Sequence, residues 1–182
     1  LQYLVRKSGI LKLLPGNLSE IEKLSPDFEL STHSFKRVEE PLKGEVLYRT
    51  AFHAGCLMKH AYGGINVSTV NVLRHNHCRV YVPENQYCCG SLHAHNGEMD
   101  TALQLARKNI DSFNAGEYDV LISNSAGCGA FMKEYGHLFE GDADYSQKAK
   151  VFASKVKDVM EFLDSIEMVR GEGAAGEEVT YH

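Results

Sequence analysis

The sequence lacks runs of basic residues, long apolar runs and a secretion signal. Its 24 acidic side chains outnumber its 19 basic ones, for a formal net charge of -5. Because phosphate contacts need clustered Lys and Arg, we expect no nucleic-acid partner. No apolar run approaches the length of a membrane span, so we expect no direct span. Residues 1–6 lack the basic-then-apolar order of a signal peptide, so we expect the protein to lie in a reducing cytoplasm.

The spacing C-x-x-C is also missing, although the chain has five cysteines. A secreted disulfide framework usually shows an even count in a smaller chain. In a reducing compartment, cysteines act as buried apolar side chains, metal ligands or redox groups. The five are Cys56, Cys78, Cys88, Cys89 and Cys128.

Strand-like and helix-like segments alternate from residue 45 onward. This order predicts an α/β domain with a mostly parallel sheet and flanking helices. The predicted strands are residues 46–52, 78–82 and 119–123. The predicted helices are residues 66–74, 99–113, 129–139 and 145–163.

The length of 182 residues fits one domain with appendages. We expect an N-terminal extension over residues 1–43, which contains a short apolar stretch at 10–14. The domain is predicted over residues 44–168. A linker rich in glycine and glutamate follows over residues 169–182 and ends in the start of a strand at 178–182. The chain begins without methionine, so we expect it to be part of a longer protein.

Four cysteines fall in loops that follow the predicted strands. Cys56 follows the first strand, Cys88 and Cys89 follow the second, and Cys128 follows the third. Loops after the carboxyl ends of parallel strands share one edge of a sheet, and ligand sites form there. The sequence therefore predicts that four sulfur atoms gather at that edge.

Glycines flank these four cysteines. Glycine permits tight turns and the close approach of the backbone to a bulky group. Helices predicted to start after Cys56 and Cys128 would aim their amide dipoles at the sulfur atoms and favour thiolates. The flanking glycines are Gly55, Gly90, Gly127 and Gly129.

Four thiolates suit either a tetrahedral zinc ion or an iron–sulfur cluster. Zinc sites usually contain a C-x-x-C knuckle, and the adjacent pair Cys88–Cys89 fits a multi-iron cluster more easily than a single ion. The chemistry favours a cluster and leaves zinc as the alternative. Cys78 lies inside a predicted strand, and we expect it to be a buried core residue.

Two histidines, His93 and His95, follow the cysteine pair directly. They could ligate metal, donate hydrogen bonds to sulfur or bind a substrate. The alternative is a pair of partly exposed loop histidines. The polar turn Lys133–Tyr135, close to Cys128, is predicted to face solvent.

Three motifs together resemble the Rossmann-like, cysteine-rich CCG domain. They are Gly55-Cys56, Cys88-Cys89-Gly90 and Ala126-Gly127-Cys128-Gly129. This domain occurs in the glycolate oxidase iron–sulfur subunit, in lactate-utilisation iron–sulfur proteins and in the cysteine-rich subunit of heterodisulfide reductase. The stretches 88–95 and 125–136 are most similar to the glycolate oxidase subunit. The resemblance covers residues 44–165 and looks like the first of two such domains.

The resemblance implies an iron–sulfur electron-transfer module, itself non-catalytic, of a complex that oxidises glycolate or a similar 2-hydroxy acid. Its partners would be a flavin-containing oxidase subunit, and a ferredoxin-like region and second CCG domain in the full-length chain. The location would be cytoplasmic, with any membrane association through partner subunits. The implied cluster ligands are Cys56, Cys88, Cys89 and Cys128, with Gly55, Gly90, His93, His95, Ser125, Gly127 and Gly129 around them.

One position departs from the pattern of the cysteine-rich heterodisulfide reductase subunit, which has a further cysteine where this chain has Ser125. Four ligands suit a 4Fe–4S cluster, or a site that the missing domain completes, rather than the five-cysteine noncubane cluster. The alternative functions are a subunit of the heterodisulfide or thiol–disulfide reductase type and a non-enzymatic zinc-binding scaffold.

Overall fold

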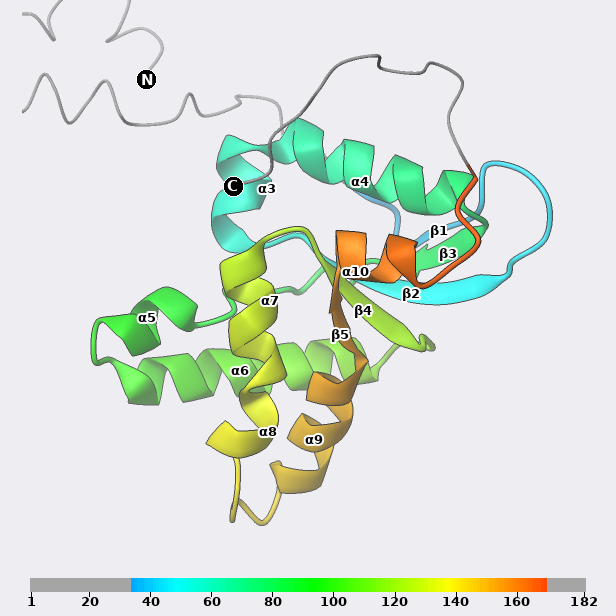
Figure 1. The fold of residues 1–182 in the computed structure, drawn as a ribbon. Helices are drawn as coiled ribbons and strands as arrows, with labels where there is room; N and C mark the ends of the chain where they lie inside the picture. The colour runs from blue at the N-terminus through cyan, green and yellow to red at the C-terminus, as the bar shows by residue number, and fades with distance from the viewer. Residues whose placement is uncertain (1–33, 170–182) are drawn as a thin grey trace, which may run out of the picture.

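A five-stranded sheet forms the centre of the domain in the computed structural model, which describes residues 34–169 (Figure 1). The strand order is β1-β3-β2-β4-β5, with β1 antiparallel to β3 and the other pairs parallel. The predicted α/β class is confirmed, and the three predicted strands are β2, β3 and β4. The strands are β1 (Val38–Glu39), β2 (Tyr48–His53), β3 (Cys78–Tyr81), β4 (Val120–Ser123) and β5 (Val156–Asp158).

Helices flank the sheet, with α4 on one side and α6 to α9 on the other (Figure 1). The predicted helices at 66–74 and 99–113 correspond to α4 and α6. Of the helices within residues 34–169, none is both long and apolar enough to cross a bilayer. The helices are α3 (Cys56–Ala61), α4 (Gly63–His75), α5 (Ser91–His95), α6 (Met99–Asn114), α7 (Ala126–Lys133), α8 (Tyr135–Leu138), α9 (Ser146–Lys155) and α10 (Val159–Asp164).

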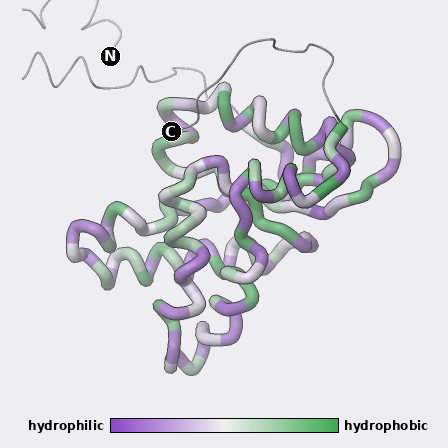
Figure 2. Tube along the Cα trace, viewed as in Figure 1, coloured by the Kyte–Doolittle hydropathy of each residue, from purple (hydrophilic) through white to green (hydrophobic). Residues whose placement is uncertain are grey.

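The core lies in two layers because side chains of a strand point alternately to opposite faces. Phe52 and Ile122 pack with apolar side chains of α4 and α10. Their neighbours Ala51 and Leu121 point the other way and pack with α6, α7, α8 and α9. Hydrophobic and hydrophilic residues alternate along α4 (Figure 2), as expected for a helix that buries one face.

The prediction of one continuous helix over residues 145–163 was wrong. Helix α9 ends at Lys155, β5 pairs in parallel with β4, and α10 then begins. The apolar residues that suggested one helical face are divided between the two faces of the sheet: Phe152 belongs to the α6 side and Leu163 to the α4 side. Asp158 caps α10 by accepting from Met160 N at 2.9 Å.

The predicted helix over residues 129–139 also begins and divides differently. Helix α7 starts three residues earlier, at Ala126, and α8 starts at Tyr135. Cys128 therefore lies inside the first turn of α7, and Cys56 is the first residue of α3. The sequence had suggested that each cysteine precedes its helix, and this prediction was wrong for both.

Part of the expected extension over residues 1–43 is described. Its strand β1 pairs with the edge of β3, and Val82 N donates to Arg37 O at 2.9 Å. The apolar stretch at 10–14, most of the expected linker and the expected strand at 178–182 lie outside the described residues.

Candidate functional site

Four cysteine side chains lie at the carboxyl ends of three neighbouring strands. Cys56 follows β2, Cys88 and Cys89 lie between β3 and α5, and Cys128 follows β4. Because β2 lies between β3 and β4, the Cys56 loop lies between the other two loops. One edge of the sheet therefore carries all four thiols.

The four thiols form two pairs. The sulfur atoms of Cys56 and Cys88 lie 3.4 Å apart. The Cys89 thiol donates a hydrogen bond to the Cys128 sulfur, which lowers the pKa of Cys128 to about 6, and a hydrogen bond from Ser125 acts in the same direction. The same bond to Cys128, together with burial, raises the pKa of the Cys89 thiol.

Electrostatic interactions link the two pairs. Burial raises the pKa of Cys56, and the negative charges of Cys88 and Cys128 raise it further. The charge of Cys88 likewise contributes to the raised pKa of Cys89. Charge on a thiol of one pair therefore raises the pKa of a thiol in the other pair. Within residues 34–169, no three His, Cys, Asp or Glu side chains converge where a single metal ion could bind.

Backbone amides also reach the sulfur atoms. The amide of Leu57 donates to Cys56, and the amide of Ser91 donates to Cys89. Such bonds favour the thiolate form, which is the form that binds metal. Each pair of thiols therefore contains one sulfur atom that accepts from a backbone amide.

Exposure to solvent differs across the group. Cys89 is buried, Cys88 and Cys128 are half-buried, and Cys56 is exposed. A hollow of about 470 Å³ lies beside the Cys56–Cys88 pair, with Lys59 and Tyr87 in its wall. The group is accordingly reached from solvent on the Cys56 side.

Three amide side chains, of which Asn66 is fully buried and Gln86 and Asn124 are half-buried, connect the loops. Gln86 accepts from Ala54 N at 2.8 Å and donates to Phe52 O at 3.1 Å. Asn66, on α4, donates to Ala54 O at 2.8 Å, and Asn124 donates to Asn66 Oδ1 at 2.9 Å. This amide network, Gln86–Asn66–Asn124, ties the loops after β2, β3 and β4 together without a metal.

The flanking glycines fall into two kinds. Gly55 and Gly90 have φ of 67° and 91°, a region that residues with a Cβ rarely adopt. Gly127 and Gly129 lie within α7. Turn geometry thus accounts for the first two glycines and not for the second two.

The histidines after the cysteine pair lie on α5. His93 Nδ1 is 2.9 Å from Glu98 Oε2, and His95 is exposed. Within the described part of the chain, no hydrogen bond joins either histidine to a cysteine. Cys78 is fully buried at the start of β3, which confirms the prediction of a core cysteine.

Two residues that hold the site were missed by sequence reasoning. Tyr135, predicted to face solvent, is fully buried, and its hydroxyl donates to Cys89 O at 2.6 Å. Asn109 is fully buried on α6 and donates to Cys88 O at 3.0 Å. A signal for Asn109 was present, because it interrupts the apolar stripe of its helix between Ala106 and Phe113.

A comparison with protein families finds that residues 50–133 match the cysteine-rich domain family, CCG. These residues form a cysteine-rich CCG domain. The resemblance drawn from the motifs around Cys56, Cys88, Cys89 and Cys128 is thereby confirmed. No solved structure gives a significant match to the chain.

The relatives of this chain include proteins whose names describe them as iron–sulfur proteins or subunits. The chain is 40% identical over 164 residues to a probable glycolate oxidase iron–sulfur subunit from Bacillus subtilis (strain 168), which covers 90% of the chain and 37% of the relative. It is 35% identical over 128 residues to lactate utilization protein A from Shouchella clausii, covering 70% of the chain and 53% of the relative. The chain thus spans about a third to a half of the length of these relatives.

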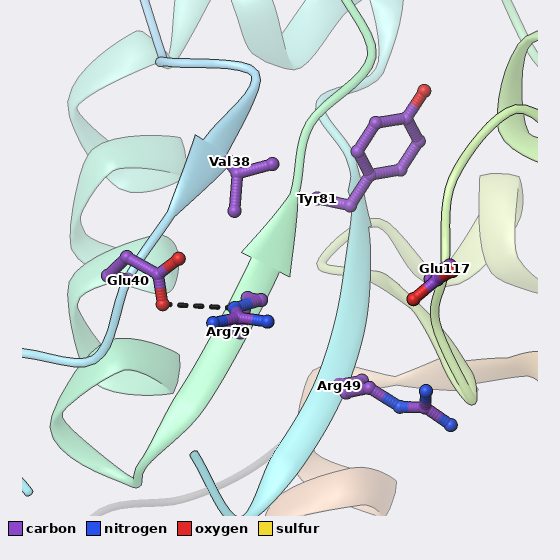
Figure 3. Close-up of a pocket in the computed structure, with 6 residues that line it drawn as sticks. All are labelled: Val38, Glu40, Arg49, Arg79, Tyr81 and Glu117. Carbon is purple, nitrogen blue, oxygen red and sulfur yellow. Dashed lines mark hydrogen bonds and ion pairs between the residues drawn. The ribbon is translucent and has the colours of Figure 1, made fainter. Parts of the chain in front are cut away.

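A second hollow of the CCG domain, of about 380 Å³, lies away from the cysteines over β1, β2 and β3 (Figure 3). Its two arginines are paired within the domain: Arg79 with Glu40 at 3.0 Å, and Arg49 with Asp119 at 2.8 Å. The candidate site is therefore the cysteine edge. The second hollow is lined by Val38, Glu40, Arg49, Arg79, Tyr81 and Glu117.

Proposed function

We propose that this CCG domain holds an iron–sulfur cluster, of the 4Fe–4S type, and serves as an electron-transfer module of a complex that oxidises glycolate or a similar 2-hydroxy acid. The observation that carries the proposal is the gathering of four thiols at one edge of the sheet, with the sulfur atoms of Cys56 and Cys88 in contact. The names of the relatives add the iron–sulfur and glycolate oxidase associations.

The donor set fits a cluster by its chemistry. All four candidate ligands are thiols: Cys56, Cys88, Cys89 and Cys128. Soft thiolates bind iron–sulfur clusters and zinc in preference to hard metal ions. Adjacent Cys88 and Cys89 reach different partners. Such an arrangement suits ligands shared among several iron atoms better than four ligands on one zinc ion.

When bound, an iron–sulfur cluster supplies one-electron redox chemistry at a potential that its surroundings set. This chain's part is to hold it and to adjust that potential. The amides of Leu57 and Ser91 and the Ser125 side chain donate to ligand sulfurs, which stabilises their negative charge. Burial of Cys89 keeps water from one side of the site, and exposure of Cys56 leaves the other side open to a partner.

The wider organisation is part of the proposal. Residues 44–168 form the CCG domain, and residues 1–43 and 169–182 lead to a ferredoxin-like region and a second CCG domain of a longer chain. A cytoplasmic flavin-containing subunit delivers the electrons, and a downstream acceptor, membrane-associated through other subunits, takes them.

The test is metal and sulfide analysis of the chain purified or reconstituted without oxygen, together with its visible absorption. We expect iron and sulfide with thiolate-to-iron bands. Replacing any one of Cys56, Cys88, Cys89 or Cys128 by Ser should sharply reduce iron loading. Cys78→Ser, at a buried cysteine outside the site, is the matched control. Zinc in place of iron, or equal loading of Cys128→Ser and Cys78→Ser, would overturn the proposal.

A second candidate function is thiol–disulfide reduction, which the 3.4 Å contact between Cys56 and Cys88 favours. In that reaction the two thiols would form a disulfide while a substrate disulfide is reduced to two thiols. Reduction of a disulfide substrate that persists without any flavin-containing partner would favour this function over electron relay.

A further inference from the structure

The adjacent residues Cys88 and Cys89 direct their thiols to different partners. Cys88 contacts Cys56, 3.4 Å away, and Cys89 hydrogen-bonds to Cys128. One peptide unit joins the two residues, so a change in the backbone dihedral angles of either residue would move one sulfur atom relative to the other. The spacing between the two thiol pairs therefore depends on how firmly the backbone of this dipeptide is fixed.

The α6 residue Asn109 fixes the first half of this backbone. Its Nδ2 donates to Cys88 O at 3.0 Å and to Tyr87 O at 3.3 Å, and its Oδ1 accepts from Tyr87 N at 3.0 Å. Asn109 is fully buried. A single side chain thus satisfies three backbone groups immediately before and at Cys88.

Tyr135, from the start of α8, fixes the second half. Its hydroxyl donates to Cys89 O at 2.6 Å, and its side chain is fully buried. His53, at the end of β2, lies with Nε2 3.1 Å from Tyr87 O. A carbonyl oxygen only accepts, so Nε2 carries the proton. Three consecutive carbonyl groups are therefore held by buried side chains from three separate elements.

We propose that Asn109 and Tyr135 are positioning residues for the cluster. They fix the carbonyl groups of Cys88 and Cys89 so that the two thiols stay at the spacing that the cluster needs. This inference rests on the proposed function. Neither residue is a candidate ligand, and each acts through the backbone of a candidate ligand cysteine. Groups that orient metal ligands in this way typically change metal affinity by roughly 10- to 100-fold when they are removed.

Two variants test the inference, each with a matched control. Tyr135→Phe removes one oxygen atom and keeps the ring, and Tyr145→Phe is its control because the Tyr145 hydroxyl bonds to Asp111. Asn109→Asp keeps the size and the acceptor but loses the donor, and Asn114→Asp is its control at an exposed position of the same helix.

Each chain is reconstituted with iron and sulfide without oxygen and then titrated with a chelator. Iron retention and the electron paramagnetic resonance spectrum of the reduced protein are measured. We expect Tyr135→Phe and Asn109→Asp to lose iron at roughly 10-fold lower chelator concentration than the wild-type chain, with a shifted spectrum. Both controls should match the wild type.

Wild-type retention and an unchanged spectrum in Tyr135→Phe would overturn the inference, even if Asn109→Asp fails to fold. Tyr135→Phe decides alone in that case, since it leaves the packed ring in place. A wild-type chain that takes up no iron would instead overturn the proposed function, so the two failures are distinguishable.

Discussion

The sulfur atoms of Cys56 and Cys88 lie 3.4 Å apart, although 32 positions separate the two residues along the chain. The contact joins the loop after the central strand β2 to the loop after β3. Two thiols at this distance can be joined by oxidation with a rotation of their side chains. The same closeness that suits ligands of one cofactor therefore also makes the metal-free pair sensitive to oxidants.

We predict that diamide links Cys56 to Cys88 in the metal-free chain. The two thiols lose two protons and two electrons as the disulfide forms, and the diazene is reduced to a hydrazine. Cys78 should stay reduced because it is fully buried. Peptide mapping by mass spectrometry identifies the crosslink. Cys56→Ser should remove it, and a principal crosslink that involves Cys78 would contradict the prediction.

Asn66→Ala should destabilise the fold, because it leaves the buried Ala54 carbonyl without its partner. It also removes one of the two acceptors of the Asn124 amide, which keeps its bond to Thr69 Oγ1 at 3.0 Å. An unsatisfied buried polar group costs about 1–3 kcal/mol. Urea unfolding measures the change in free energy. Asn71→Ala is the control, since Asn71 is an exposed asparagine on the same helix. Equal stability of the two variants would show that the amide network does not hold the loops.

Gly90→Ala and Gly127→Ala should change stability in opposite directions. At Gly90, with φ of 91°, a Cβ would lie 3.0 Å from the Ala102 carbonyl oxygen, and the left-handed backbone alone costs roughly 1–2 kcal/mol. At Gly127, within α7, a Cβ would meet nothing within 4 Å. Alanine there should add up to about 1 kcal/mol in the metal-free chain, because it is the better helix former. Thermal unfolding of both variants checks the contrast.

His53 should make the fold less stable in mild acid. Burial lowers the pKa of His53 below its usual value of 6.5. The unfolded chain then binds this proton more readily than the folded one. The contribution of His53 to the free energy of unfolding is therefore complete above pH 6.5 and decreases as the pH falls below it. The slope for one proton is about 1.4 kcal/mol per pH unit. Urea unfolding between pH 5 and 7 should show a shallower slope for His53→Gln, and an identical slope would refute this role.

The placement of the cysteine loops could be predicted because it follows from strand order alone. Cys56, Cys89 and Cys128 each follow a strand recognisable by its apolar residues, and parallel strands carry their loops to the same edge. The pairing of Cys88 with Cys56 and of Cys89 with Cys128 could not be predicted. It depends on side-chain directions that loop sequences do not specify.

The break between α9 and α10 was missed in the sequence, because the apolar residues on either side of it keep a helical spacing. Phe152 and Leu163 continue a helical spacing, yet they pack on opposite faces of the sheet. A signal was present in the pair Asp158 and Glu161, whose spacing is that of a capping box. Local periodicity outweighed it because the pairing of β5 with β4 is a long-range contact.

The amide network Gln86–Asn66–Asn124 has a consequence for the relation between folding and cofactor binding. Its hydrogen bonds brace the loops after β2, β3 and β4 from within the polypeptide. Folding and metallation are therefore expected to be separable events. Under the proposed function, a chain that has lost its cluster is expected to keep its fold and to bind a new cluster without first unfolding.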